Sequence, residues 1–439
     1  MTRNGLASPM NSEPSSGQRF TATKTGKVLA EATGLLRGPQ RIVPLLVKLA
    51  SDELHTGFAQ RHLYSYASVT RPTPEALQDL VKWILDAQRA DGGIAAYYSL
   101  LTGYSESYPE VTGYIIPTLY DYALATGDQR ARAAAERATS WLLSLQLPSG
   151  AFPGGLHGAS AAPSVFNTGQ ILQGLVRAHV ETRSAEILRC ATAAGDWLAQ
   201  TQQPDGAWSG PGAYQEVAHT YYSMVSWALA QLAANSADSP YASAAERNID
   251  WVLTNAKPSG WIDGINLQGH PAYLHFIAYV IQGVLECGIL RHRENAIRAA
   301  GKAAWVLLRR FETHKFLFGT YGPDFKGGLR FTCLTGNAQM SCVWLRLFEV
   351  TGDLRYLNAA LKMNEMLKQL MPTRGRRGVV GGVAGSSPIW GAYQPLRYIS
   401  WGCKFFADAL LLEQRLMHQV EVEFETRSAS QVEGRVEVS

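Results

Sequence analysis

Four carboxylates near the starts of predicted buried helices could carry acid–base chemistry: Glu110, Glu216, Asp263 and Asp324. Glycoside hydrolysis uses two carboxylates, one protonated as the acid and the other acting as base or nucleophile. Glu110 is the favoured acid or base because it follows Tyr108-Pro109, among aromatic residues, and Asp263 or Asp324 is its expected partner. Two simpler interpretations compete. Glu110 could only satisfy a helix dipole, and the two aspartates could be ordinary turn residues.

Two histidines and a tyrosine provide a second acid–base set. His219 and His275 lie near the starts of adjacent buried helices, and Tyr393 lies at the expected start of another. Together with neighbouring tyrosines they could form the Tyr/His set of a uronate lyase or epimerase, which removes a proton from C5 of the sugar. Alternatively, each histidine is a hydrogen-bonded residue of the core.

Aromatic, amide and guanidinium side chains cluster at the same predicted end of these helices. Aromatic rings stack on pyranose faces, while amides and Arg bind hydroxyls or uronate carboxylates. The predicted substrate-binding residues are Tyr108, Asn167, Gln170, Tyr222, Trp261, Arg330, Asn337, Gln339, Trp390 and Arg397. A single ring at such a position often only packs the rim of a helical barrel, but their number favours a saccharide cleft.

Several other classes of protein are disfavoured. The chain has no HExxH or CxxC motif, no Walker loop and no GxGxxG in a Rossmann context, so neither metal nor cofactor is expected. A net charge of +4 does not favour nucleic acid. The five cysteines lie in apolar helical stretches and indicate reduced thiols. We expect no signal peptide, no transmembrane segment and a cytoplasmic location.

These residues are held by a repeat of about 56 residues. Trp83, Trp141 and Trp197 are each followed after five residues by Gln and after four more by Gly. The frame continues at Trp251, Trp305 and Met366, so that the six positions lie 58, 56, 54, 54 and 61 residues apart. Repeated units bury their faces against their neighbours and form one body.

Each unit contains two predicted helices. The first helices have one apolar face and are expected at 74–88, 129–146, 184–202, 240–256, 293–311 and 354–371. The second are apolar nearly all round and are expected at 111–126, 167–182, 216–234, 274–290, 335–350 and 393–414. Helices that are apolar on every face are buried. Six outer and six inner helices predict an all-α, closed (α/α)6 toroid, with an open solenoid as the alternative.

This architecture makes a prediction about the site. The long loops run from each outer helix to the next inner helix, and should meet at one mouth. Thr-Gly at 112–113, 168–169 and 335–336 suggests that the inner helices need a small residue to approach one another. The predicted domains are a disordered segment (1–25), a helical leader (26–70), the toroid (71–416) and a tail (417–439) that could be a short strand or a frayed end.

Two resemblances refine this interpretation. Gln202-x3-Gly206-x-Trp208 is similar to the QW repeat of squalene and oxidosqualene cyclases, which share α/α-toroid folds with protein prenyltransferase β subunits. No two aspartates are adjacent anywhere in the chain, although the acid motif of those cyclases is Asp-rich. The resemblance therefore implies a shared α/α-toroid architecture.

The second resemblance spans about residues 75–415. The strings at 108–119 (YPEVTGYIIPTL), 335–340 (TGNAQM) and 393–401 (YQPLRYISW) look like uncharacterised bacterial proteins encoded among exopolysaccharide and capsule biosynthesis genes. Six-hairpin glycosidases, uronate lyases and sugar epimerases share the toroid fold. Fold alone does not determine function.

Together these observations predict a carbohydrate-active enzyme, glycoside hydrolase-like or uronate lyase/epimerase-like. Its substrate would be a saccharide, lipid- or nucleotide-linked, in bacterial polysaccharide biosynthesis. The alternatives are a terpenoid cyclase or prenyltransferase-like enzyme and a non-catalytic sugar-binding toroid.

Overall fold

A computed structural model describes residues 71–235, 240–266, 271–329 and 331–436, with side chains to Val422. The predicted polar segment 1–25 and helical leader 26–70 lie outside the described residues. Within the described ranges no helix is long and apolar enough to cross a membrane.

The described chain alternates between outer and inner helices, as the repeat predicts. The outer helices are α3 (Thr73–Ala87), α5 (Gln129–Leu143), α7 (Ala185–Thr201), α9 (Pro240–Thr254), α11 (Glu294–His314) and α13 (Leu354–Leu370). The inner helices are α4 (Pro109–Thr126), α6 (Val165–Thr182), α8 (Ser223–Ala233), α10 (Leu274–Leu290), α12 (Leu334–Thr351) and α14 (Ser400–Val436).

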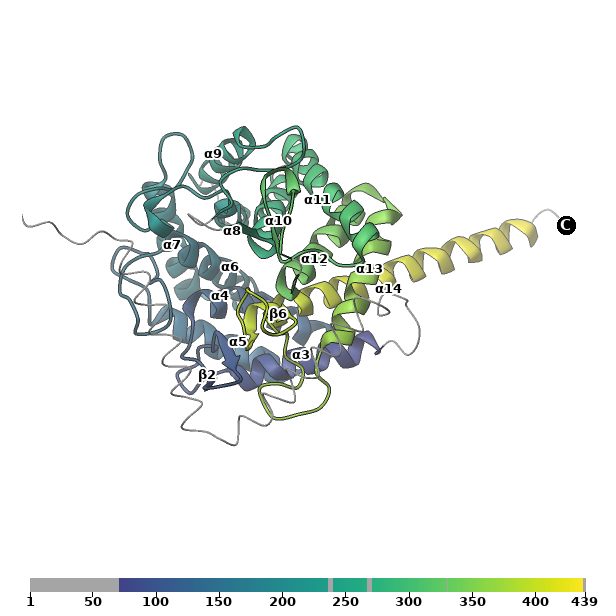
Figure 1. Cartoon of the computed structure of the whole chain (residues 1–439), viewed down its shortest axis with the longest axis horizontal. Helices are drawn as coiled ribbons and strands as arrows, with labels where there is room; N and C mark the ends of the chain where they lie inside the picture. The colour runs from purple at the N-terminus through teal and green to yellow at the C-terminus, as the bar shows by residue number, and fades with distance from the viewer. Residues whose placement is uncertain (1–70, 236–239, 267–270, 330, 437–439) are drawn as a thin grey trace, which may run out of the picture.

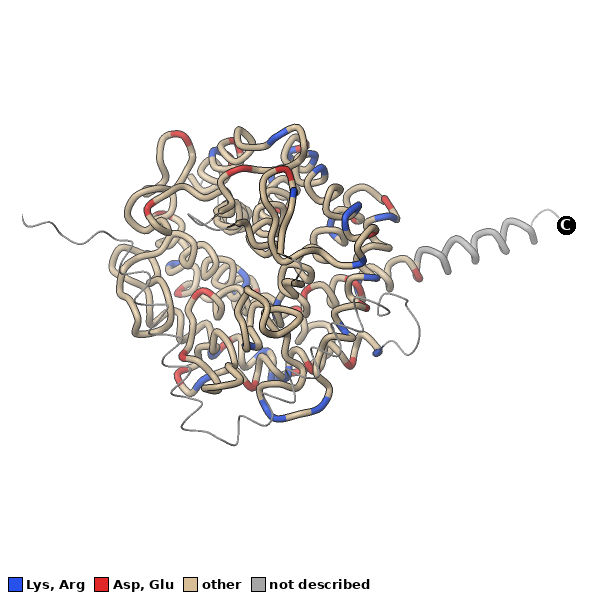
Figure 2. Tube along the Cα trace, in the orientation of Figure 1, with Lys and Arg blue, Asp and Glu red and all other residues tan. Residues whose placement is uncertain are grey.

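The inner helices form a closed ring. Each packs against the next in chain order, and the last, α14, packs against the first, α4. Figure 1 shows the outer helices surrounding this ring. Figure 2 shows that charged residues lie mostly on the outer helices and loops. The predicted (α/α)6 toroid is therefore confirmed, and an open solenoid is wrong because α14 closes onto α4.

The Thr-Gly positions are points of close approach between neighbouring inner helices. A Cβ atom on Gly113 would lie 2.5 Å from the Cα of Ile171 on the next inner helix. On Gly169 it would meet the side chain of Val225 at 2.8 Å, and Gly336 is similarly crowded. The small residue is thus needed for helix packing, as predicted.

The repeated Gln and Gly have a structural role. The Gln202 amide donates to the carbonyl of Gly206, at 3.0 Å, and to that of Ala244 on the next outer helix, at 2.8 Å. Gln88 and Gln146 make the same pair of bonds in their own units. Each Gln therefore joins the end of one outer helix to the following loop and to the neighbouring outer helix.

We expect Gln202→Ala to lower the free energy of unfolding by about 1–3 kcal/mol, because two backbone carbonyls lose their side-chain donor. Gln203→Ala is the matched control, since the Gln203 side chain is exposed and makes one long hydrogen bond, of 3.4 Å, to Ser209. Urea unfolding measures both variants, and equal losses would contradict the structural role.

Short strands gather at the N-terminal ends of the inner helices. The pairs are β1 (Tyr97–Ser99) with β2 (Gly103–Tyr104) and β7 (Arg397–Ile399), β3 (Ala272–Tyr273) with β4 (Thr320–Tyr321), and β5 (Thr332–Cys333) with β6 (Ser386–Ser387). All the pairs are antiparallel, and Tyr98 lies opposite Tyr398, so β1 and β7 join the first and last units. The long loops therefore meet at one mouth.

Two inner helices begin later than predicted. The prediction that the third starts at Glu216 is wrong, because Gln215 and Glu216 have positive φ of 54° and 56°. Two 3-10 turns, η2 (Tyr214–Glu216) and η3 (Thr220–Tyr222), precede α8. The sixth starts at Ser400 instead of Tyr393, because Gln394 and Leu396 also have positive φ and β7 follows them.

Of the two interpretations of the C-terminal tail, a short strand or a frayed end, the strand is wrong. Residues 417–436 continue α14 as a helix that projects from the ring (Figure 1). Six residues that alternate between apolar and charged need a partner strand to form a ladder. Adding turns to an existing helix, in contrast, costs less free energy than nucleating a new element.

Candidate functional site

Glu110 lies in the first turn of α4, where Pro109 occupies an N-terminal position that suits proline. Glu110 is 8% exposed, and its carboxylate accepts a hydrogen bond of 2.5 Å from the Tyr108 hydroxyl. Burial raises the pKa of Glu110 to about 7, against a smaller lowering by Tyr108. A carboxyl group with this pKa can both give and take a proton near neutral pH.

Tyrosines surround this carboxyl group. Burial raises the pKa of each, and the Glu110 charge raises it further in Tyr108, Tyr114, Tyr221, Tyr279 and Tyr393. These phenols come from four separate parts of the ring, and they stay protonated as hydrogen-bond donors. We call Glu110 and these five tyrosines the Glu110 cluster.

Further rings extend the cluster outward. Phe166 on α6 packs against Tyr221 and Tyr279, with centroids 5.2 and 5.3 Å apart. Phe276 lies 5.4 Å from Tyr221, and Tyr273 lies 5.3 Å from Tyr393. Phe166, Tyr273, Phe276 and Tyr108 are partly exposed. An aromatic wall therefore leads from the surface toward Glu110.

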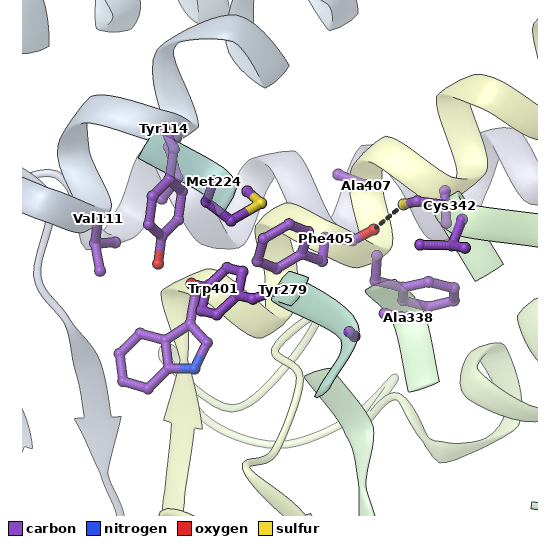
Figure 3. Packing of buried hydrophobic residues seen from close by; sticks show 14 of the residues in the cluster. Val111, Tyr114, Met224, Tyr279, Ala338, Cys342, Trp401, Phe405 and Ala407 are labelled. Atoms are coloured by element: carbon purple, nitrogen blue, oxygen red, sulfur yellow. Dashed lines mark hydrogen bonds between the residues drawn. The ribbon is translucent and has the colours of Figure 1, made fainter. Parts of the chain in front are cut away.

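The inner side of the cluster is closed by aromatic packing. Figure 3 shows Tyr114, Tyr279 and Phe405 lying together between α4, α10 and α14. The Phe405 ring lies 6.0 Å from Tyr114 and 5.8 Å from Tyr279. Trp401 donates to the Tyr393 hydroxyl at 2.8 Å, which holds that tyrosine in place.

His275 lies beside the cluster, 4.1 Å from the Tyr279 ring. Its Nδ1 is 3.0 Å from the Gln339 side-chain oxygen, and the Gln339 amide donates to Gln282 at 2.8 Å. With Gln339 oriented in this way, Nδ1 carries the proton. Burial lowers the pKa of His275 to about 3, despite the bond to Gln339. The imidazole is therefore neutral at physiological pH.

His219 packs against the Glu110 cluster and supports a neighbouring loop. It is 1% exposed, stacks on Tyr221 at 4.8 Å, and its Nε2 bonds the backbone oxygen of Tyr214 at 3.0 Å. Burial lowers its pKa. The hydroxyl of Tyr222 accepts from the Tyr214 backbone amide at 2.7 Å. Both side chains hold the loop that carries Tyr214.

The two predicted partner aspartates lie in the neighbourhood of Lys257 instead. Asp263 pairs with Lys257 at 2.8 Å and accepts from buried Trp261 at 2.9 Å. Asp324 accepts from Ser259 at 2.6 Å, and its charge also acts on Lys257. Neither aspartate contributes to the raised pKa of Glu110. Among the described residues these two carboxylates form a separate rim cluster around Lys257.

Three predicted sugar-binding amides are fully engaged within the fold or deeply buried. Asn167 donates to the Pro153 carbonyl at 3.1 Å, and Asn337 donates to that of Cys333 at 2.8 Å. Gln170 is 0% exposed, and its oxygen accepts a long bond, of 3.4 Å, from Gln173. Their positions indicate roles in helix and loop packing.

The remaining predicted residues lie at the periphery. Arg397 donates to Gln394 at 3.0 Å and stacks over the Tyr97 ring at 4.2 Å. Trp390 is 38% exposed, and Glu216 is exposed on its turn. Arg330 lies outside the described residues.

Tyr114, Trp401 and Phe405 were not among the predicted site residues. Tyr114 could have been found, because it lies four residues after Glu110 on one helix and so shares its face. Trp401 and Phe405 reach the cluster only because the last inner helix closes the ring. In the described parts of the chain no group of His, Cys, Asp or Glu is arranged to hold a metal ion.

Comparison with known proteins supports the architecture. Residues 66–284 match the family model of the squalene-hopene cyclase C-terminal domain. No curated protein matches the chain by sequence.

Solved structures with this fold include an unsaturated glucuronyl hydrolase specific for heparin, at 14% identity and a TM-score of 0.65, covering 79% of this chain and 96% of that one. A cellobiose 2-epimerase from Bacillus thermoamylovorans B4167 is 12% identical with a TM-score of 0.63, covering 78% and 98%. A D-mannose isomerase is 11% identical with a TM-score of 0.61, covering 80% and 100%. At these identities the likeness shows the fold.

Proposed function

We propose that this chain, a member of the (α/α)6-toroid superfamily, is an acid–base enzyme that acts on a saccharide, with Glu110 as the group that moves the proton. The observation that carries the proposal is the Glu110 cluster. A carboxyl group with a pKa of about 7 lies among five protonated phenols, with an aromatic wall leading to it. A catalytic acid or base works best when its pKa lies near the working pH.

The arrangement favours proton transfer at carbon over two-carboxylate hydrolysis. Glycosidases need a second carboxylate about 5–10 Å from the first, and Asp263 and Asp324 are engaged with Lys257 and Ser259 instead. In the proposed step, ionised Glu110 removes a proton from a sugar carbon next to a carboxylate or carbonyl group. The C–H electron pair passes into an enolate, whose oxygen accepts hydrogen bonds from the surrounding phenols. A phenol then gives its proton to carbon, or to a departing alkoxide, and protonated Glu110 returns a proton to the resulting phenolate.

The partly exposed rings of Phe166, Tyr273 and Phe276 suit a pyranose ring. Solved toroids of similar fold include enzymes whose names specify saccharide substrates, which supports the same class here. We further propose that the substrate is a lipid- or nucleotide-linked saccharide of bacterial polysaccharide biosynthesis, processed in the cytoplasm. The five described cysteines are unpaired and buried, which fits a reducing compartment.

Hydrogen exchange at carbon tests the reaction type. The protein is incubated in D2O with cellobiose, mannose and glucuronic acid, and NMR follows deuterium incorporation at each ring C–H. We expect incorporation with the wild-type protein and none with Glu110→Gln. Hydrolysis without exchange would refute the proposed reaction, and absence of any turnover, with binding retained, would favour a non-catalytic sugar-binding toroid.

One observation favours a terpenoid cyclase as the second candidate. Glu110 is a buried acid in an aromatic, largely apolar interior. The family model that matches the chain is that of the squalene-hopene cyclase C-terminal domain. However, protonation of an isolated alkene requires a strong acid, and burial makes Glu110 a weaker one than a free carboxyl group. Incubation with squalene separates the candidates, because a cyclised product would overturn the saccharide assignment.

We expect the pH profile of the exchange reaction to follow Glu110. Its carboxylate form is the base, and it is lost as pH falls below its pKa of about 7. The kcat/KM value should therefore fall about tenfold per pH unit below that point and level off above it. Initial rates measured across the range test this. A profile that is flat through neutral pH would exclude Glu110 as the base.

A further inference from the structure

A cavity opens at the end of the ring opposite the Glu110 cluster, where the inner helices end. Its volume is about 710 Å³, and all six inner helices contribute residues to it. The contributing positions lie in the middle or C-terminal parts of α4, α6, α8, α10 and α12, and in the first four turns of α14. This volume lies within the range of small-molecule binding sites.

The rings of Tyr114, Tyr279 and Phe405 lie together (Figure 3), and this group of rings adjoins both the cavity and the Glu110 cluster. Lys404 belongs to the cavity wall, and its Nζ lies 4.1 Å from the Phe405 ring centroid and 5.5 Å from that of Tyr114. Phe405 and Tyr114 in turn contact each other and Tyr279 at the base of the cluster. The two sites therefore share one layer of rings and are otherwise distinct.

The charges of the cavity are paired with one another. Arg177 binds Asp121 at 2.7 Å, and Lys404 binds Asp408 at 2.6 Å. On the other side, Arg346 binds Glu286 through two bonds, of 2.8 and 3.1 Å. Glu286 and Lys404 are each nearly buried.

This pairing decides which ligands suit the cavity. Arg415 also binds a carboxylate, that of Glu349, at 2.7 Å. Each cation of the wall is therefore neutralised by a carboxylate. The C-terminal ends of helices carry partial negative charge, which disfavours an anion. A metal ion is disfavoured as well, because the carboxylates are already bound to cations. The remaining match is a neutral ligand that both donates and accepts hydrogen bonds.

Amides and one indole ring complete this match. Gln173 and Gln282 are buried in the wall, and the Gln231 side-chain oxygen is buried without a hydrogen-bond partner. Trp227 contributes a partly exposed ring. Sugar hydroxyls can form hydrogen bonds with both members of an ion pair and with amides. The Trp227 ring supplies a surface on which a sugar ring can stack.

We propose that this cavity is a second saccharide-binding site, for a neutral mono- or disaccharide, on the face opposite Glu110. Binding there does not require that Glu110 be catalytic. The shared layer of Phe405 and Tyr114 places the bound sugar directly behind the Glu110 cluster.

Calorimetric titration of the full chain tests this with glucose, N-acetylglucosamine and cellobiose as probes and inorganic phosphate as the anionic comparison. We expect at least one sugar to bind, and phosphate not to compete. Trp227→Ala should weaken binding about tenfold through loss of the stacked ring. Gln231→Leu, which keeps the size of the side chain, should weaken it as well.

Glu110→Gln is the control, since it alters the other site. Retained binding in this variant and loss in Trp227→Ala and Gln231→Leu, with unchanged circular dichroism, would establish the second site. Failure of all three sugars to bind, equal binding by wild type and both cavity variants, or loss of binding in Glu110→Gln would overturn it. Catalysis is not measured, so the proposed function stands or falls separately.

Discussion

Glu110→Gln is expected to lower the turnover of a saccharide substrate by about 10²–10⁴-fold, the contribution of a positioned general acid or base. The amide keeps the shape of the carboxyl group and a hydrogen bond to Tyr108, but it cannot exchange a proton. Substrate affinity should change less than turnover, because the aromatic wall remains. Steady-state kinetics of the two proteins provide the measurement.

The same substitution should stabilise the protein at alkaline pH. The folded-state pKa of Glu110, about 7, lies above its ordinary value of 4.5. The folded state therefore binds this proton more tightly than the unfolded state, and the associated stability is lost as pH rises from about 4.5 through 7. The penalty is of the order of 3 kcal/mol for a shift of this size. Unfolding at pH 5 and pH 8 should show this loss in the wild type and a smaller one in Glu110→Gln.

Glu106→Gln is the matched control, because Glu106 is exposed and only four residues away. It should leave turnover and the pH dependence of stability unchanged. Full activity in Glu110→Gln would remove Glu110 from the mechanism, whatever its effect on stability.

Gly113→Ala is expected to destabilise the toroid by about 3 kcal/mol, the upper part of the range for overpacking. The new Cβ would lie 2.5 Å from the Cα and 2.9 Å from the amide nitrogen of Ile171. These are backbone atoms of α6, which cannot rotate away as a side-chain end could. The α4 and α6 helices would have to separate. Thermal and urea unfolding measure the loss.

Gly301→Ala serves as the comparison. Gly301 lies within α11, and the nearest atom to a new Cβ is a Leu347 methyl group at 3.8 Å, an ordinary contact. Alanine should raise stability by up to about 1 kcal/mol here, through helix propensity. If Gly113→Ala and Gly301→Ala had similar stability, the close approach of α4 and α6 would not explain why position 113 is a glycine.

The repeat was the most informative feature of the sequence for the fold. Its period and its two kinds of helix predicted most helix bounds to within three residues, since a helix apolar on all faces can only be buried. The errors at the third and sixth inner helices share a cause. Positive φ at Gln215 and Leu396 ends helical geometry, and residues other than glycine give little warning of that conformation.

For the candidate site, the sequence by itself favoured Glu110, because it follows Tyr-Pro among aromatic residues at the start of an apolar helix, and it left a helix-dipole role open. Only the tertiary structure decided its partners. Asp263 and Asp324 turned toward Lys257 and Ser259, while five tyrosines from four separate parts of the ring came to surround Glu110. The physical reason is that burial follows from local apolar pattern, whereas the pairing of polar side chains depends on loop conformation and on the closure of α14 onto α4, both of which involve residues far apart in the chain.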